Sequence, residues 1–245
     1  MQLTRRGFAF GLGTSIGSPL YAFPSRRAAF VLGISDYRSA RDLATPNGDS
    51  ANIASVLGSL GFQTVLRQNL NRSEIFEEFA RFRWVASTAD LVVVYIASHG
   101  FFAEGESYVV ASDATGAGQA MEAAVPVSAL RWMVSDRPRQ KVFLLDTCRD
   151  KPLSRPPRIP MAQRSTAGEF TCFAAQPGEV AFDDIDGQSP FARALLGGLE
   201  RPGLDMAELS RFIRLHTLAQ TDGQQVPWSV STLLAPVVLN RNGSG

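Results

Sequence analysis

Cysteine and histidine are scarce in this chain of 245 residues, which contains two of each. Two cysteines, Cys148 and Cys172, cannot form a disulfide framework, and we expect them to have separate roles. An excess of charge of one sign is also missing, because 24 Lys and Arg residues are balanced by 23 Asp and Glu residues. The chain as a whole therefore gives no electrostatic reason to expect a nucleic-acid partner. Its apolar fraction of 45% is enough for a large core.

A long apolar run is missing as well, even at the N-terminus, where no charged side chain lies between Arg6 and Arg26. This stretch is too short and too rich in Gly and Ser for a membrane span. Its opening, "TRRGF", instead predicts that residues 1–25 are a twin-arginine export signal, which would place the protein in the periplasm or outside the cell. An incidental Arg-Arg pair in a cytoplasmic protein is the alternative.

The cleavage site of this signal is poorly defined. Ala22 is small, but no small residue lies two positions before it. Retention of the signal as a membrane tether is therefore a further alternative, and it is the only basis on which we expect a membrane partner.

Apolar runs and helical spacing alternate along residues 26–240. Runs rich in β-branched residues are typical of strands buried on both faces, and they occupy residues 27–35, 90–98 and 140–146. Helical spacing follows the first two of these strands, and Asp49 and Ser50 are candidates for the first helix cap. The alternation predicts a single α/β domain whose mostly parallel central sheet is covered by helices on both faces.

Two of the predicted strands end at chemically reactive residues, His99 and Cys148. The carboxyl ends of neighbouring parallel strands meet at one edge of a sheet, so these side chains should lie close together. A histidine within reach can take the proton of a thiol and create a nucleophile, and the backbone N–H groups of Gly100 and Cys148 are then candidate oxyanion donors. The alternative is a buried structural cysteine beside a hydrogen-bonded histidine. The second histidine, His216, shares a helical face with apolar residues and is not a catalytic candidate.

A series of motifs in residues 28 to about 239 resembles the caspase-like clan of cysteine peptidases (peptidase family C14), in particular its bacterial metacaspase-like branch. In order along the chain these motifs are "FVLGISDY", "TPNGDSANI", "VVVYIASHG", "SYVVASDA", "VFLLDTCRD", "SPFARALL" and "QVPWSVSTL". The resemblance implies the caspase-hemoglobinase fold and peptide-bond hydrolysis through an acyl-enzyme with a His99 and Cys148 dyad. No cofactor is required by this chemistry, and peptides or proteins are the implied substrates.

The same resemblance bears on specificity. Metacaspases place acids at the positions of Asp146 and Asp49, and two carboxylates in a partly desolvated pocket would attract Arg, or Lys as second choice, at the residue before the scissile bond. A strand-end hydrogen-bonding role for Asp146 and a helix cap for Asp49 are the alternatives. Many family members have glycine where this chain has Ser98, and serine where it has Ala97, which bears on the exact preference rather than on the dyad.

A segment rich in proline and arginine, near residues 151–170, matches the linker between the large and small subunits of caspases. Arg164 is the preferred candidate for self-cleavage and Arg158 the second, whereas an exposed linker cut by other proteases is an equal alternative. Residues 241–245 form a polar tail.

A later acidic loop provides weak candidates for a calcium site, namely Asp183, Asp184 and Asp186. Solvated loop carboxylates are the more ordinary interpretation, because the spacing is not that of an EF-hand. Two other functions stay open, a caspase-like module that binds peptides or partners without turnover, and a cysteine hydrolase of non-peptide amides. The oligomeric state is not predicted.

Overall fold

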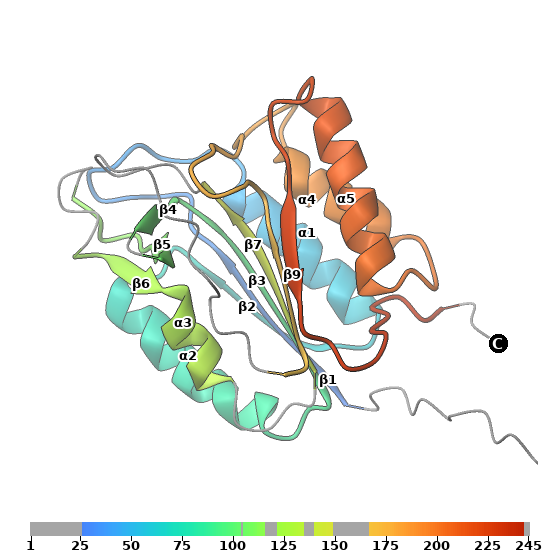
Figure 1. Cartoon of the computed structure of the whole chain (residues 1–245). Helices are drawn as coiled ribbons and strands as arrows, with labels where there is room; N and C mark the ends of the chain where they lie inside the picture. The colour runs from blue at the N-terminus through green and yellow to red at the C-terminus, as the bar shows by residue number, and fades with distance from the viewer. Residues whose placement is uncertain (1–25, 104, 116–121, 135–139, 149–166, 243–245) are drawn as a thin grey trace, which may run out of the picture.

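A computed structural model of the chain describes residues 26–103, 105–115, 122–134, 140–148 and 167–242. Its centre is a six-stranded sheet with the order β2-β1-β3-β7-β8-β9, in which all neighbours are parallel except β8 and β9 (Figure 1). The strands are β1 (Arg27–Gly33), β2 (Gln63–Gln68), β3 (Leu91–Ser98), β7 (Gln140–Thr147), β8 (Glu169–Phe173) and β9 (Trp228–Ser231). The predicted α/β class with a mostly parallel sheet is confirmed.

Helices cover both faces of this sheet, as predicted (Figure 1). One face packs against α1 (Pro46–Ser59), α4 (Pro190–Leu199) and α5 (Met206–Gln220), and the other against α2 (Arg72–Ala86) and α3 (Val127–Met133). A small antiparallel sheet of β4 (Gly100–Ala103), β5 (Glu106–Val110) and β6 (Ala124–Pro126) lies on the α2 side. This second sheet was not predicted from the sequence.

The strand pleat divides the core into two clusters. Phe30 of β1 points toward α2, where its ring lies 4.4 Å from that of Phe79, whereas the next residue, Val31, packs with Ile53 of α1. Every residue of β1 and β3 is buried. This explains why these strands are continuous apolar runs rather than alternating ones.

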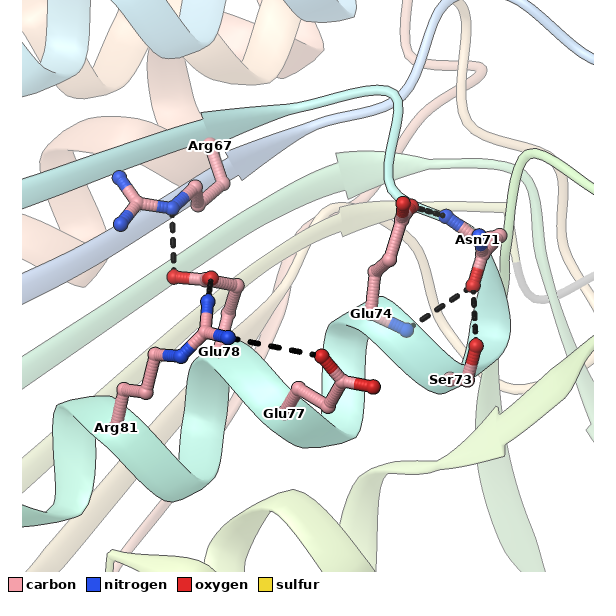
Figure 2. A network of polar contacts seen from close by, with 7 residues as sticks. All are labelled: Arg67, Asn71, Ser73, Glu74, Glu77, Glu78 and Arg81. Carbon is pink, nitrogen blue, oxygen red and sulfur yellow. Dashed lines mark hydrogen bonds and ion pairs between the residues drawn. The ribbon is translucent and has the colours of Figure 1, made fainter.

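Helix α2 is fixed at its start and along its surface by polar contacts (Figure 2). The Asn71 side chain accepts from the Glu74 N–H, and the Glu74 side chain accepts from the Asn71 N–H, which together form a capping box. Glu78 bridges Arg81 of the same helix and Arg67 of β2, whose Nε lies 2.7 Å from the carboxylate. The helix is therefore tied to the edge strand of the sheet.

The start of α1 differs from the prediction. The helix begins at Pro46 after Thr45, so Asp49 lies in its first turn, Ser50 lies just beyond it, and the predicted caps are wrong. Proline at the first turn is favoured because its missing N–H would have no partner there, and that preference set the boundary. At α4, by contrast, Ser189 is the N-cap and its hydroxyl accepts from the Ala192 N–H.

Several predictions lie outside the described residues. These include the export signal at 1–25, most of the 151–170 linker with Arg158 and Arg164, and the end of the polar tail. In the part of the chain that the structure describes, no helix has the length and apolarity needed to cross a membrane. Both cysteines are free thiols, as expected.

Candidate active site

The two reactive residues follow paired positions on neighbouring strands. β3 and β7 are parallel, and Ser98 lies opposite Thr147 as the last pair of their register. His99 and Cys148 are the residues that follow the two strands, so both lie at the same carboxyl edge of the sheet. The predicted placement of these two residues at one edge is what the topology shows.

Cys148 is partly exposed and lines a pocket at this edge of the sheet. Its Sγ lies 3.2 Å from the carbonyl oxygen of Ala181, to which the thiol donates. The pocket is lined by Leu43, Thr45, Pro46, Ala97, Ser98, Asp146, Cys148, Ala181, Phe182, Asp183 and Ser189. A partly exposed thiol in the wall of a pocket is positioned to meet a substrate.

The ring of His99 is oriented by a backbone carbonyl. Nε2 lies 2.6 Å from the oxygen of Arg41, and because a carbonyl only accepts, Nε2 must be the nitrogen that bears hydrogen. In the neutral ring, Nδ1 is then the unprotonated nitrogen and is available to accept a proton. The backbone of Arg41 therefore selects the tautomer that a general base needs.

Tyr37 is a site residue that sequence reasoning missed. Its hydroxyl accepts from the backbone N–H of His99 at 2.8 Å and donates to the carbonyl of Ile34 at 3.1 Å, while the two rings lie 4.7 Å apart. Burial raises the pKa of Tyr37 well above its usual value, so it remains a neutral donor and acceptor. Only its place after the first buried strand, in "GISDY", could have suggested it.

Gly100 lies close to the other strand end. A Cβ on this residue would lie 2.8 Å from the Cβ of Thr147 and 2.9 Å from the carbonyl oxygen of Cys148. No side chain fits without moving the Thr147 side chain and the backbone carbonyls of Tyr108 and Cys148, which explains the glycine after the histidine. The candidate oxyanion donors, the N–H groups of Gly100 and Cys148, thus belong to segments in close contact.

Acidic side chains gather behind the thiol. Asp146 of β7 is buried, lines the pocket, and accepts through Oδ2 from Ser189 at 2.5 Å and from Tyr95 at 3.1 Å. Asp49 of α1 is buried and accepts through Oδ2 from the Ser189 N–H at 3.0 Å. The two candidate specificity residues are therefore joined through one serine.

Burial is the main influence on the ionisation of these acids. It raises the pKa of Asp146 to about 7, with a further contribution from the negative charge of Asp49. It raises the pKa of Asp49 to about 6, with a contribution from the charge of Asp183. Carboxylates that resist ionisation in this way gain most from a nearby cation.

The three calcium candidates do not converge. Asp183 lines the pocket and accepts from the Ala44 N–H at 2.6 Å, whereas Asp184 accepts from the Gly187 N–H at 2.6 Å, and Asp186 adopts a positive φ of 54°. Within the described ranges, no group of three His, Cys, Asp or Glu side chains is placed to hold a metal ion. Asp183 instead connects its loop to the start of α1.

The other cysteine and histidine lie away from this site. Cys172 is buried in β8, where burial raises the pKa of its thiol to about 12. His216 lies on the surface of α5, where Nδ1 donates to the Phe212 carbonyl at 2.8 Å and the ring stacks on Phe212. Its predicted place on a helix face is confirmed.

Comparison with known proteins agrees with this architecture. A crystal structure of caspase-1 from Spodoptera frugiperda matches with a TM-score of 0.70 and 20% sequence identity, over 91% of this chain and 93% of that chain. At this identity the likeness shows the fold, and the predicted caspase-hemoglobinase fold is confirmed. The family model described as "Caspase domain" matches residues 26–238, so the chain belongs to this family of cysteine peptidases. No curated protein gives a significant match.

Proposed function

We propose that this protein is a cysteine endopeptidase of metacaspase type that cleaves after Arg, or after Lys as second choice, with His99 as base and Cys148 as nucleophile. The observation that supports this most directly is the register of β3 and β7, which delivers both residues to one edge beside an acidic pocket. The His99 tautomer selected by the Arg41 carbonyl supports the role of base.

The reaction follows from these positions. The thiol turns away from the Ala181 carbonyl, its proton passes to Nδ1 of His99, and the thiolate attacks the substrate carbonyl carbon. N–H groups of Gly100 and Cys148 stabilise the oxygen that becomes negative. His99 then returns the proton to the leaving amine, and water hydrolyses the thioester to free the thiol and the carboxylate product.

Specificity for a basic residue is proposed from the carboxylates of the pocket. Asp146 and Asp183 line it, and Asp49 lies behind Asp146 through Ser189. A guanidinium or ammonium group would compensate these buried charges, whereas an acidic side chain would add to the repulsion.

A comparison of matched fluorogenic peptides tests the proposal. Peptides ending in Arg, Lys or Asp are incubated with the wild-type chain and with Cys148→Ala, in the presence and absence of calcium. We expect hydrolysis after Arg that depends on Cys148, slower hydrolysis after Lys, and none after Asp. Absence of Cys148-dependent hydrolysis from folded protein would favour a binding module, and hydrolysis only of non-peptide amides would favour the other alternative.

Self-cleavage is a second part of the proposal. The linker near 151–170 contains Arg158 and Arg164, which have the residue type that the acidic pocket would accept. Intact mass should show a cut after Arg164 in the wild type, none in Cys148→Ala, and a shift toward Arg158 in Arg164→Ala. A cut that also occurs in Cys148→Ala would assign it to another protease.

Two expectations from the N-terminus and the chemistry complete the proposal. Residues 1–25 have the sequence of a twin-arginine signal and would bring the enzyme to the periplasm or beyond. The proposed reaction uses no cofactor, and the calcium arms of the peptide assay test whether the ion alters the rate.

A further inference from the structure

We propose that Tyr95 and Ser189 are positioning residues for the recognition of a basic side chain, because they hold Oδ2 of Asp146 and leave Oδ1 for the substrate. This inference rests on the proposed function and adds two residues to it, Ser189 in the pocket wall and Tyr95 in the buried sheet beside it. Both act through Asp146.

The contacts fix the direction of the carboxylate. Tyr95 Oη and Ser189 Oγ both donate to the same oxygen, Oδ2 of Asp146, at 3.1 Å and 2.5 Å. Neither reaches Oδ1, and Asp146 is part of the pocket wall. A carboxylate held by two donors at one oxygen cannot rotate freely, so its second oxygen keeps a constant direction.

Ser189 is itself fixed by its place in the fold. It caps α4, and its Oγ accepts from the Ala192 N–H at 2.9 Å. With that lone pair in use, the single hydroxyl proton is left to donate to Asp146. Its backbone N–H donates to Oδ2 of Asp49, so one residue orients both acids.

Tyr95 approaches from the sheet. It belongs to β3, is fully buried, and lies one strand away from Asp146 of β7. Burial raises the pKa of Tyr95 far above its usual range, so the hydroxyl stays a donor at every working pH. A phenylalanine ring would fill this apolar core position equally well. The Tyr95 hydroxyl is accommodated there because it donates to Asp146.

The two donors affect the ionisation of Asp146, because this carboxyl is buried. Burial raises its pKa to about 7, the Ser189 and Tyr95 hydrogen bonds oppose that rise, and the charges of Asp49 and Asp183 add to it. The titratable and charged groups facing the cluster are Asp49 from α1, Tyr95 from β3, Cys148 after β7, Cys172 from β8, and Asp183 from the loop before α4.

One carboxylate oxygen of Asp49, Oδ1, is buried without a hydrogen-bond donor among the described residues, although Oδ2 is held by Ser189. A buried carboxylate oxygen without a donor is costly unless a cation or donor reaches it. Binding of a basic side chain near Asp146 would place positive charge close to this oxygen as well.

Tyr95→Phe in the full-length chain is the main test, because it removes one hydroxyl and retains the ring. We measure kcat and KM for the Arg peptide from about pH 5 to about pH 9. Without the Tyr95 donor Asp146 should ionise at higher pH, so the acid limb of kcat/KM should move up by about half a pH unit or more. KM should rise severalfold at neutral pH with a much smaller change in kcat. The matched control is Tyr108→Phe in β5, outside this cluster, which should leave the acid limb in place.

Ser189→Ala gives an independent test with a control for capping. It removes a helix cap as well as a donor to Asp146, so it is compared with Asn71→Ala, which removes the cap of α2 (Figure 2). Both variants should lose thermal stability, Ser189→Ala more because it also loses the buried hydrogen bond to Asp146, but only Ser189→Ala should raise KM for the Arg peptide and reduce the preference for Arg over Lys. Equal effects of the two variants on KM would show that Ser189 has only a structural role and would overturn the proposal that it positions Asp146.

An infrared titration separates this inference from the proposed function. The carboxylic acid band that is lost in Asp146→Asn should titrate near neutral pH in the wild type and at higher pH in Tyr95→Phe, whether or not any peptide is cleaved. If wild type cleaves after Arg and neither the acid limb nor the band moves in Tyr95→Phe, the positioning role is wrong and the proposed function stands. If wild type cleaves nothing but the band moves as expected, the proposed function is wrong, whereas the effect of the Tyr95 hydrogen bond on Asp146 is confirmed.

Discussion

Ser98 of β3 lies directly opposite Thr147 of β7 in a parallel register. The residues that follow this pair are His99 and Cys148, which are 49 positions apart in the sequence. The Arg41 carbonyl and the Tyr37 hydroxyl then hold His99 from the loop that follows β1. Three adjacent parallel strands, β1, β3 and β7, thus contribute to one site.

Selective alkylation should distinguish the two thiols. Cys148 is partly exposed at the pocket, whereas Cys172 is buried with its pKa raised to about 12. Iodoacetamide at neutral pH should therefore add one group per native chain, at Cys148, and none to native Cys148→Ala. Intact mass and peptide mapping measure this, with urea-unfolded Cys148→Ala as the control in which Cys172 reacts. Modification of Cys172 in folded protein would contradict the burial described above.

Tyr37→Phe should impair the orientation of His99. The variant loses the acceptor for the His99 N–H and the donor to the Ile34 carbonyl, and a lost buried hydrogen bond costs about 1–1.5 kcal/mol. We expect kcat/KM to fall about tenfold, mainly through kcat, with KM nearly unchanged. Steady-state kinetics with thermal unfolding of the same samples check this. A large increase in KM with normal kcat would mean that Tyr37 acts on binding instead.

Asp49→Asn should change stability in a pH-dependent way. Because the folded pKa of Asp49 is raised to about 6, the folded state binds the proton more tightly than the unfolded chain does. This contribution to stability is full below about pH 4 and is lost as the pH rises through 6. The neutral asparagine avoids the loss, so the variant should exceed wild type by about 2 kcal/mol at pH 8.

Urea unfolding of both proteins at pH 4 and pH 8 measures this difference. Near pH 4 the two free energies of unfolding should approach one another, since Asp49 is then protonated in the folded state. A variant that is less stable than wild type at pH 8 would show that the Ser189 N–H compensates the buried charge fully.

Gly33→Ala should destabilise the fold at the start of α1. A Cβ at Gly33 would overlap Ser50 Oγ and the Pro46 carbonyl oxygen, and it would lie 2.9 Å from the Pro46 carbonyl carbon. We expect a loss of roughly 2–4 kcal/mol, as for other overpacked sites. Gly58→Ala in α1 is the matched control, because a Cβ there meets nothing within 4 Å and should stabilise by up to about 1 kcal/mol. Equal unfolding midpoints would rule out the close contact at Gly33.

The order of strands and helices could be predicted from local pattern. β1, β3 and β7 are buried on both faces, so the middle of each strand is a continuous apolar run, and the amphipathic spacing of α2 follows from its single buried side. The small sheet β4-β5-β6 was missed because its strands are short and their pairing depends on long-range contacts. The start of α1 was misplaced because Asp49 looked like a cap, whereas its carboxylate is directed to Ser189, 140 positions away.

That a histidine and a cysteine end two buried strands, and that acids occur near them, can be read from the amino-acid order. The selection of the His99 tautomer by the Arg41 carbonyl, the bond from the His99 N–H to Tyr37, and the link from Asp49 to Asp146 through Ser189 become visible only in the folded protein. The difference lies in the range of the interactions. Strand burial and helical periodicity are properties of neighbouring residues, whereas these hydrogen bonds join loops and caps whose meeting depends on the whole sheet being assembled.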